Sequence, residues 1–470
     1  MDDRAKILYR WTMVAVGAAE LLSWLAFRLG LMVPITSLVI AFVWWLAWRW
    51  PKWLSLVSLV ELVIGGKGYL FWLDLSGSVS LHIPIRMIVF SVLLVATAVS
   101  WYREKRWPWP TRAFMPAAVL LLWVIIMTGW GLAVGHGLST TYQDANAWGY
   151  LLILPCWWFW WRKQPGWQSL ILTVLLAGVT TVAIKTWVVQ VLFNHLSAPT
   201  LETFYRWIRQ TGIGEITHLS GPLYRVFFQS HLYLLLGLLL TVSGWLFGRA
   251  PRWWLWPMIA SGVGLYLSLS RSLWLGVAGG GVVLLYQFLQ ARRSLSAWRV
   301  IWLLPLAIAI WLLSSWAVNF PYVLSPVGAP RPSSAVIARL YSPGSQQAAS
   351  ARANQFRPLI QAIRQQPLTG HGFGTTVRYY STDPRVKGWR TTFAFELGYL
   401  DLWLKFGIIG LGLLSWWVWS IRQNLRRTKW YPWLWGGVIA ILVTHLTTPY
   451  LNHPLGLGWL ALVTVYASDQ

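Results

Sequence analysis

The chain has 470 residues, of which 57% are hydrophobic and only 11% are charged, and its mean hydropathy is +0.53. This composition excludes an ordinary water-soluble protein, whose core needs far less apolar sequence. The single cysteine, Cys156, excludes a disulfide framework and a Cys-based metal site. The formal charge of +25 does not require nucleic acid, because Lys and Arg in membrane proteins set topology and face lipid headgroups or phosphorylated substrates.

Apolar runs recur along the whole chain, and each is close to the roughly 20 residues that cross a bilayer as a helix. We therefore predict an all-α fold, a polytopic transmembrane helix bundle of about 12–14 spans with a large extracytoplasmic loop carrying short amphipathic helices. The 39 Trp residues gather near the ends of these runs, as interfacial anchors do. The predicted spans are residues 11–28, 30–48, 53–72, 83–101, 113–134, 147–162, 167–194, 227–247, 252–269, 272–289, 299–317, 394–420, 431–447 and 454–468.

The distribution of Lys and Arg predicts which loops face the cytoplasm. With the N-terminus inside, alternate loops should be basic, and they are. An even number of spans then returns the C-terminus to the cytoplasm, and the first apolar run continues into further spans, so we expect no cleavable signal peptide. The basic loops are residues 49–52, 103–112, 162–163, 249–252, 292–299 and 422–429.

This topology divides the chain into membrane segments and outer segments. We predict five parts: N-terminal transmembrane helices at 1–194, an extracytoplasmic loop at 195–226, central transmembrane helices at 227–317, a large extracytoplasmic loop at 318–393, and C-terminal transmembrane helices at 394–470. The outer segments hold nearly all the sequence that is not apolar, so they are the candidate working parts.

The loop at 318–393 carries nine Lys or Arg residues and one acid, Asp383. The positive-inside rule predicts the fewest cations on this side, so topology does not explain the excess. An anionic partner does, and because eight of the nine are Arg, bidentate phosphate contacts fit best.

The same loop begins with an extended Pro-rich lead-in at 321–332 and continues into a helix at 348–366. Helical spacing predicts one apolar face on that helix, and Arg residues between its members indicate a basic amphipathic helix on the membrane surface. Pro358 is expected to kink or restart it. The predicted apolar face comprises Phe356, Leu359, Ile360 and Ile363.

Three polar residues at the outer membrane boundary are the candidate site. Arg225 precedes the eighth predicted span, Arg271 lies between two apolar runs, and Glu396 begins the twelfth span. A glycosyl donor on a lipid pyrophosphate needs cations for the leaving phosphate and a base for the acceptor hydroxyl. The alternatives are arginines that snorkel to headgroups and a Glu396 that caps its helix.

Charged residues inside the spans support a different class of function. Glu20, Glu61, Asp401 and Lys405 could line a path for an ion or small solute, although Asp401 and Lys405 are most simply an i,i+4 ion pair. For Glu61 and Glu20, Lys67 and Arg86 are the candidate partners in the sequence. A third alternative is a non-catalytic partner in polysaccharide export.

Metal and nucleotide motifs are missing from the sequence. It has no Asp-x-Asp, no His-x-x-x-His and no P-loop, so we predict no metal and no cofactor. The Gly-rich segment Gly370–Gly374 follows no strand–helix unit, and we interpret it as a turn.

The order of the motifs resembles the O-antigen ligase and polymerase superfamily. Arg225 comes first, then SLSRSLWLG at 268–276, then the long outer loop with residues 356–374, then KFGIIG at 405–410. The resemblance covers residues 223–421. It implies a helical membrane glycosyltransferase of the GT-C type that transfers an undecaprenyl-pyrophosphate-linked glycan, with inversion and without a metal, to an acceptor sugar hydroxyl.

The resemblance also implies roles for individual residues. The pyrophosphate-binding arginines of the family correspond to Arg225 and Arg271, and the catalytic His of the ligases corresponds to Glu396, so a polymerase is favoured over a ligase. The partners implied are the lipid-linked donor, a glycan or glycolipid acceptor, membrane lipids and polysaccharide-assembly proteins. The implied location is the bacterial inner membrane with the active site facing the periplasm. Candidates for further substrate contacts are Arg352, Arg357, His231, His371, Arg390 and Tyr399.

Overall fold

The computed structural model describes residues 2–75, 81–105, 111–220, 223–248, 250–290, 297–320, 322, 347–383 and 386–468. The predicted Pro-rich lead-in at 321–332 lies outside these residues except for Tyr322, and so do Arg331, Arg339 and Arg385 of the basic outer loop.

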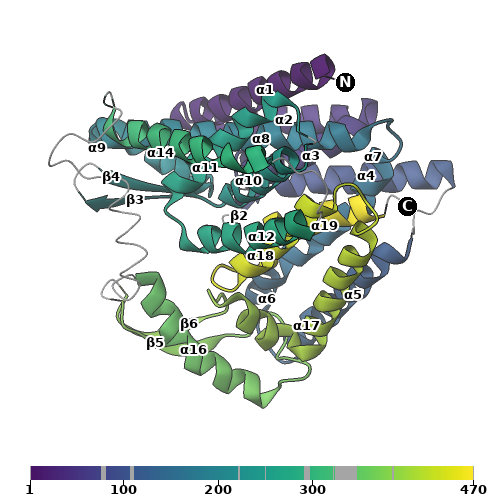
Figure 1. The fold of residues 1–470 in the computed structure, drawn as a ribbon. Coiled ribbons are helices and arrows are strands. Elements are labelled where there is room, and N and C mark those ends of the chain that lie inside the picture. Colours follow the sequence, from purple (N-terminus) through teal and green to yellow (C-terminus); the bar gives the residue numbers. More distant parts are fainter. Residues whose placement is uncertain are drawn as a thin grey trace. The chain divides into compact units, whose positions relative to one another are not determined.

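The fold is mainly α-helical, as predicted (Figure 1), and each predicted span overlaps one helix or two consecutive ones. The helices before the central outer segment are α1 (Asp2–Arg28), α2 (Met32–Arg49), α3 (Pro51–Ile64), α4 (Ile85–Glu104), α5 (Thr111–Ala133), α6 (Leu138–Ala145), η1 (Asn146–Leu152), α7 (Ile153–Trp161) and α8 (Trp167–His195). Those after it are α9 (Ala198–Gln210), α10 (His231–Leu246), η2 (Arg252–Trp254), α11 (Leu255–Ser268), α12 (Arg271–Gln290), α13 (Ala297–Ile301), α14 (Leu303–Asn319), α16 (Gln347–Gln365), α17 (Gly398–Leu425), α18 (Tyr431–His445), η4 (Tyr450–Asn452) and α19 (Pro454–Ala467).

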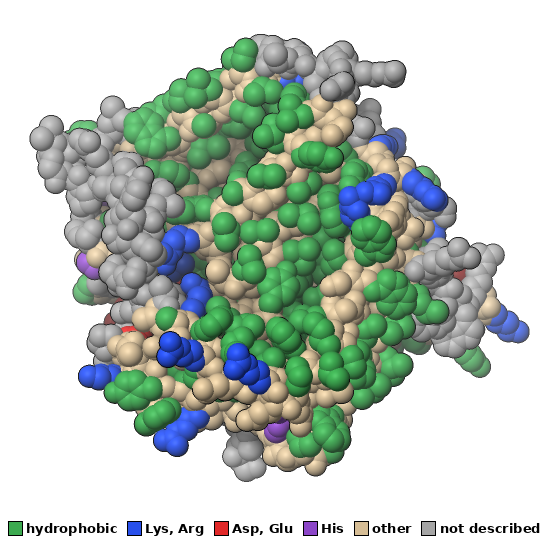
Figure 2. Space-filling view, turned by 60° about the horizontal axis from the view of Figure 1, so that its bottom comes forward, with side chains coloured by type: hydrophobic (Ala, Val, Ile, Leu, Met, Phe, Trp, Pro, Cys, Tyr) green, Lys and Arg blue, Asp and Glu red, His purple; other side chains and the backbone are tan. Residues whose placement is uncertain are grey.

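Many of these helices suit a bilayer. Among the described residues, 7 helices are long and apolar enough to cross a membrane, and α10 and α19 are shorter apolar helices. Large apolar side chains face outward, for example Trp48 at 87% and Leu38 at 67% exposure. Hydrophobic side chains also predominate on the face drawn in Figure 2. Lipid removes the penalty that water would impose on such a surface.

Three β-hairpins were not predicted. They pair β1 (Trp72–Leu75) with β2 (Leu81–Pro84), β3 (Gly214–Ser220) with β4 (Leu223–Phe228), and β5 (Val377–Ser381) with β6 (Gly388–Thr392). All three lie in or beside segments predicted to be extracytoplasmic. Open sheet edges are tolerated there because water or headgroups can satisfy the unpaired backbone groups.

The chain forms two compact units. The first unit comprises Met1–Pro108, Pro155–Val277 and Leu284–Ile337, and the second comprises Trp109–Leu154, Ala278–Val283 and Ala338–Gln470. In the first unit α8 is the central helix, with 83% of its most apolar stretch buried, and it packs against α1, α3, α10, α11 and α14. In the second unit α17 packs against α5, α16, α18 and α19.

Helix α17 is broken near its middle. At Phe406 and Gly407 the φ/ψ angles are −129°/17° and 66°/−174°, so backbone groups on both sides lose their helical partners. The segment 367–372 replaces them. The N–H groups of His371 and Gly372 donate to the two carbonyls just before Phe406 at 2.8 and 2.9 Å, and the first two N–H groups after Gly407 donate to this segment at 3.1 and 3.2 Å.

The Gly-rich segment Gly370–Gly374 forms the turn that lets residues 367–372 pack against the break in α17. Gly370, Gly372 and Gly374 have φ angles of 79°, 88° and 84°, which side-chain-bearing residues rarely adopt. A Cβ at Gly370 would lie 2.6 Å from the Gly407 nitrogen. The interpretation of this segment as a turn is therefore confirmed, and its glycines allow it to approach the break in α17.

Candidate functional site

Arg225 lies on strand β4 of the first unit, opposite Thr217 of β3. Its guanidinium Nε donates a hydrogen bond to the carbonyl of Ser268 at 3.1 Å, and its Cζ lies 4.8 Å from the centre of the Phe227 ring. The side chain is half-buried, so these contacts direct a partly accessible cation toward the end of α11.

Arg271 lies at the other side of the same turn. Helix α11 ends at Ser268, Leu269 adopts a left-handed conformation with φ 48°, and α12 begins at Arg271. Leucine at positive φ is strained, and it is also buried, so this turn holds an unfavourable backbone conformation of the kind that accompanies functional sites. The hydroxyls of Ser270 and Ser272 lie 3.1 Å apart.

The structure thus brings Arg225 and Arg271 to one turn. Arg225 bonds the carbonyl three residues before Arg271, and Arg271 occupies the first position of α12, where backbone N–H groups and the helix dipole favour an anion. Two guanidinium groups and a helix N-terminus on a short turn form an electropositive site of the kind that binds phosphate.

A row of polar side chains on α8 holds strand β4 in position. Gln190 donates to the Tyr224 carbonyl at 2.8 Å, and Asn194 accepts from the Tyr224 N–H at 3.2 Å. Thr186, one turn earlier, lies 2.8 Å from Nε2 of His231. The three α8 residues are spaced four apart and so share one face, a pattern that marks them as a candidate row in the sequence.

His231 belongs to this internal network. It is fully buried, its Nδ1 accepts the Phe228 N–H at 3.3 Å, and its Nε2 faces Thr186. The candidate role of His231 as a substrate contact does not fit this environment, because both ring nitrogens already have partners in the protein. It positions β4 and the start of α10.

Glu396 lies in the second unit, two residues before α17. Its Oε2 is 3.1 Å from a guanidinium nitrogen of Arg352 on α16, and its backbone N–H donates to Gln355 at 3.3 Å. The N-cap residue of α17 is Leu397, so Glu396 is not the residue at the cap. Glu396 therefore lies just before the helix, and its side chain, 43% exposed, is contacted by α16.

The packing of α16 explains why Arg352 is well placed. Leu359 and Ile363 are buried against Phe395 and Leu404, which fixes α16 beside the start of α17. Phe356, which the helical spacing places on the same apolar face, is 51% exposed, whereas Gln355 is buried.

Pro358 lies inside α16, which runs unbroken from Gln347 to Gln365. Of the two expectations for Pro358, a kink or a restart of the helix, the restart is therefore wrong.

The remaining candidate contacts surround α16 and α17 in the second unit. Arg357 is exposed on α16, and Arg390 is exposed on β6, where its Nε donates to Val386. His371 bonds the Ala362 carbonyl at 2.9 Å and so connects the Gly-rich turn to α16. Tyr399 donates to the Leu442 carbonyl at 2.9 Å.

The candidate residues are therefore divided between the two units. Arg225, Arg271 and His231 belong to the first unit, whereas Glu396, Arg352 and the other candidates belong to the second.

The charged residues within the spans form ion pairs. Glu61 pairs with Arg86 at 2.7 Å, which was one of the candidate pairings, and Glu20 pairs with Lys185 at 2.7 Å, which the sequence analysis missed. Such pairing is the ordinary way to keep charges in a low-dielectric environment.

The predicted pair of Asp401 and Lys405 is confirmed, with Nζ 2.6 Å from Oδ1, and it is part of a larger buried network. Lys405 also contacts Asp144, which accepts the Gly374 N–H at 2.9 Å, and Asp401 accepts from Asn452. Asp144 was missed because it is 261 residues away in the sequence and lies in a short polar segment. The network connects α6, the Gly-rich turn, α17 and η4.

Replacing Lys405 with Met should destabilise the second unit by about 3–5 kcal/mol, since it leaves two buried carboxylates without their shared cation. Thermal unfolding in detergent measures the effect. The control is Lys429→Met at an exposed position, which should change the free energy of unfolding by no more than about 0.5 kcal/mol. Equal melting temperatures for Lys405→Met and wild type would contradict the structural role of this network.

These features define a class of protein: a polytopic membrane protein whose first unit has an electropositive turn and whose second unit has a basic segment at 347–390 with a carboxylate, Glu396, beside it. The model of the family described as O-antigen ligase matches residues 256–415, so this part of the chain is similar to O-antigen ligases. The match lies within residues 223–421, where the resemblance was recognised; it includes Arg271 and Glu396, and Arg225 precedes it. No curated protein and no solved structure matches the chain. The family implies a glycosyltransferase with lipid-linked glycan substrates in a bacterial membrane.

Proposed function

We propose that this protein is a polymerase that transfers an undecaprenyl-pyrophosphate-linked glycan to an acceptor sugar hydroxyl on the extracytoplasmic face of the membrane. The observation that carries the proposal is the convergence of Arg225 and Arg271 on the turn between α11 and α12, in a chain that is similar to O-antigen ligases over residues 256–415. The reaction inverts the anomeric centre and uses no metal.

Arg225 and Arg271 bind the donor pyrophosphate. Each guanidinium can form two parallel hydrogen bonds to phosphate oxygens, and the N-terminus of α12 adds backbone donors. As the glycosidic oxygen leaves, negative charge grows on the pyrophosphate, and fixed cations stabilise that charge without reorganising. These groups supply the electrostatic stabilisation that the departing lipid pyrophosphate requires.

Glu396 acts as the general base. Its carboxylate accepts the proton of the acceptor hydroxyl, the hydroxyl oxygen forms a bond to the anomeric carbon of the donor, and the bond to the pyrophosphate breaks. The products are the extended glycan and undecaprenyl pyrophosphate. Arg352, which contacts Glu396 at 3.1 Å, orients the carboxylate, and neighbouring Arg357 and Arg390 offer exposed cations to the rest of the substrate.

The residue at position 396 supports a polymerase over a ligase. Where the resemblance places the catalytic His of the ligases, this chain has Glu. A carboxylate performs the same proton transfer, but a different residue at the acceptor side is consistent with a different acceptor. We therefore assign a growing glycan, rather than a completed glycolipid core, as the acceptor.

The ion pairs inside the spans favour this function over transport. Glu20, Glu61, Asp401 and Lys405 each have a buried partner of opposite charge, so each is accounted for by a structural role.

Purified protein, supplied with an undecaprenyl-pyrophosphate-linked oligosaccharide in the presence of a metal chelator, tests the proposal. A polymerase yields a ladder of longer glycans on the same lipid together with undecaprenyl pyrophosphate. Transfer only when a glycolipid core is added would instead identify a ligase. If the folded protein leaves the donor intact in both assays, the glycosyltransferase proposal is wrong.

A further inference from the structure

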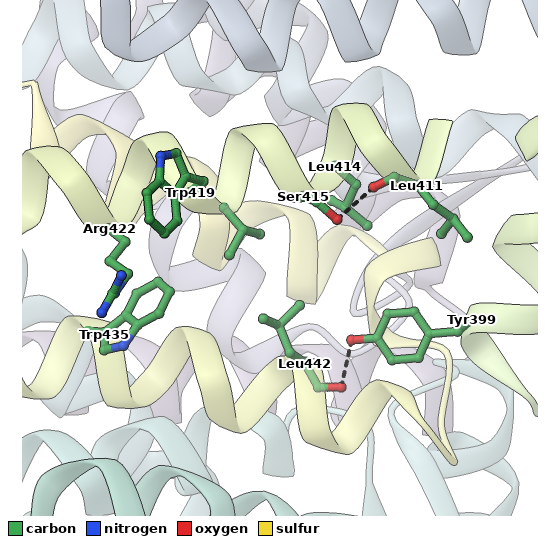
Figure 3. A pocket seen from close by; sticks show the side chains of 9 residues that line it. Tyr399, Leu411, Leu414, Ser415, Trp419, Arg422, Trp435 and Leu442 are labelled. Atoms are coloured by element: carbon green, nitrogen blue, oxygen red, sulfur yellow. Dashed lines mark hydrogen bonds between the residues drawn. The ribbon is translucent and has the colours of Figure 1, made fainter. Parts of the chain in front are cut away.

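Helices α17 and α18 enclose a groove of about 590 Å³ within the second unit (Figure 3). Leu411, Leu414 and Val418 of α17 and Leu442 of α18 form much of its wall, which is mainly apolar. One lining residue, Tyr399, is also a candidate substrate contact, and it lies at the far end of the groove. An apolar groove on membrane-spanning helices is accessible to lipid chains.

One end of the groove carries a cation between two indole rings. The Cζ of Arg422 lies 5.4 Å from the ring centre of Trp419 and 5.8 Å from that of Trp435, and Figure 3 shows the three side chains together at this end. Trp residues concentrate at the level of lipid headgroups, and the contacts with Arg422 hold its guanidinium there. This end of the groove is suited to bind a phosphate.

The basic run at 422–429 assigns this end to the cytoplasmic side of the membrane. The donor in the proposed reaction presents its pyrophosphate at the opposite side. The donor therefore does not fit a groove whose cation faces the inner leaflet.

The length of the groove matches one leaflet. Leu411 and Arg422 are 11 positions apart on one side of the helix break, which corresponds to roughly 16 Å at 1.5 Å per residue. This is about half of the roughly 30 Å hydrocarbon core. At the other end the hydroxyl of Tyr399 donates to the Leu442 carbonyl at 2.9 Å and closes the groove (Figure 3).

We propose that the groove between α17 and α18 binds an anionic phospholipid of the cytoplasmic leaflet. An acyl chain lies along Leu411, Leu414 and Val418, and the phosphate contacts Arg422. The lipid fills a space between α17 and α18 that protein side chains leave open, and so it stabilises the second unit. This inference goes beyond the proposed glycan transfer and does not depend on it.

The test compares phosphatidylglycerol with phosphatidylcholine of the same chains, added to the purified full-length protein in neutral detergent. Phosphatidylglycerol should raise the melting temperature by several degrees, because a ligand of the folded state stabilises it, and phosphatidylcholine should not. Arg422→Gln should weaken phosphatidylglycerol binding at least tenfold. Arg426→Gln removes the same charge one turn further on, at an exposed position outside the groove. This variant should bind phosphatidylglycerol as tightly as wild type does.

A second pair of variants tests the apolar part. Ser415 lines the groove, so Ser415→Phe should fill it and prevent lipid retention in native mass spectrometry with Arg422 intact. Leu413→Phe, on the same helix but outside the groove, should retain the lipid. The proposal is overturned if both phospholipids act equally, if Arg422→Gln and Arg426→Gln lose binding equally, or if undecaprenyl phosphate displaces phosphatidylglycerol from the groove.

Discussion

Replacing Glu396 with Gln is expected to lower the rate of glycan transfer by about 10²- to 10⁴-fold, the usual contribution of a general base. The amide cannot take the proton of the acceptor hydroxyl, but it preserves the size of the side chain and a hydrogen bond to Arg352. Single-turnover transfer from the lipid-linked donor measures the rate. Donor affinity and melting temperature should stay close to wild type, because the carboxylate is 43% exposed and lies outside the core.

The chain offers a closely matched control for this variant. The carboxylate of Glu215 on β3 is also exposed and is also 3.1 Å from an arginine, Arg209. Glu215→Gln removes a comparable surface ion pair and should leave transfer unchanged. A wild-type transfer rate in Glu396→Gln would exclude Glu396 as the base. An equal loss of transfer rate in both variants would indicate that removing a surface negative charge, rather than a base, lowers the rate.

Replacing Arg225 or Arg271 with Ala is expected to weaken binding of undecaprenyl pyrophosphate by roughly 10- to 100-fold. A hydrogen bond to a charged group contributes about 1.5–3 kcal/mol, and 1.4 kcal/mol corresponds to a tenfold change in affinity. Titration of the lipid in detergent measures the dissociation constant. Arg225→Lys should recover only part of the affinity, since an ammonium group preserves the charge but not the bidentate geometry.

Two other arginines are the controls. Arg209 on α9 and Arg364 on α16 are exposed and are not assigned to the phosphate site, so Ala at either should change affinity little. Arg225 also bonds the Ser268 carbonyl, so its replacement can affect folding as well as binding. The melting temperature of each variant is therefore measured together with its affinity. Unchanged affinity in both Arg225→Ala and Arg271→Ala would reject pyrophosphate binding at this turn.

The helices could be predicted closely from the sequence. Each predicted span overlaps one helix or two consecutive ones, because an apolar run in a bilayer must satisfy its own backbone hydrogen bonds, and 7 of the described helices are long and apolar enough to cross a membrane. The more polar segments lack this constraint. Their three hairpins, including β4 with Arg225, depend on pairing between strands and were missed.

Side-chain partners could be predicted where they are close in the sequence. Asp401 and Lys405 are one helical turn apart, so their ion pair follows from helix geometry. Asp144 and the pairing of Glu20 with Lys185 join distant elements, and no local pattern indicates them. Likewise Phe356 has the helical spacing of a buried residue but lies exposed, because the packing of α16 on α17 selects a different face.

The sequence by itself determined the class of protein, the approximate positions of its apolar helices and the residue types that could bind phosphate. Those features arise from composition and local periodicity, which act on each segment separately. Tertiary structure alone decided that Arg225 meets the turn before Arg271, that Arg352 holds Glu396, and that His231 is an internal residue. Such contacts depend on how distant helices and strands pack, and packing is a property of the whole fold.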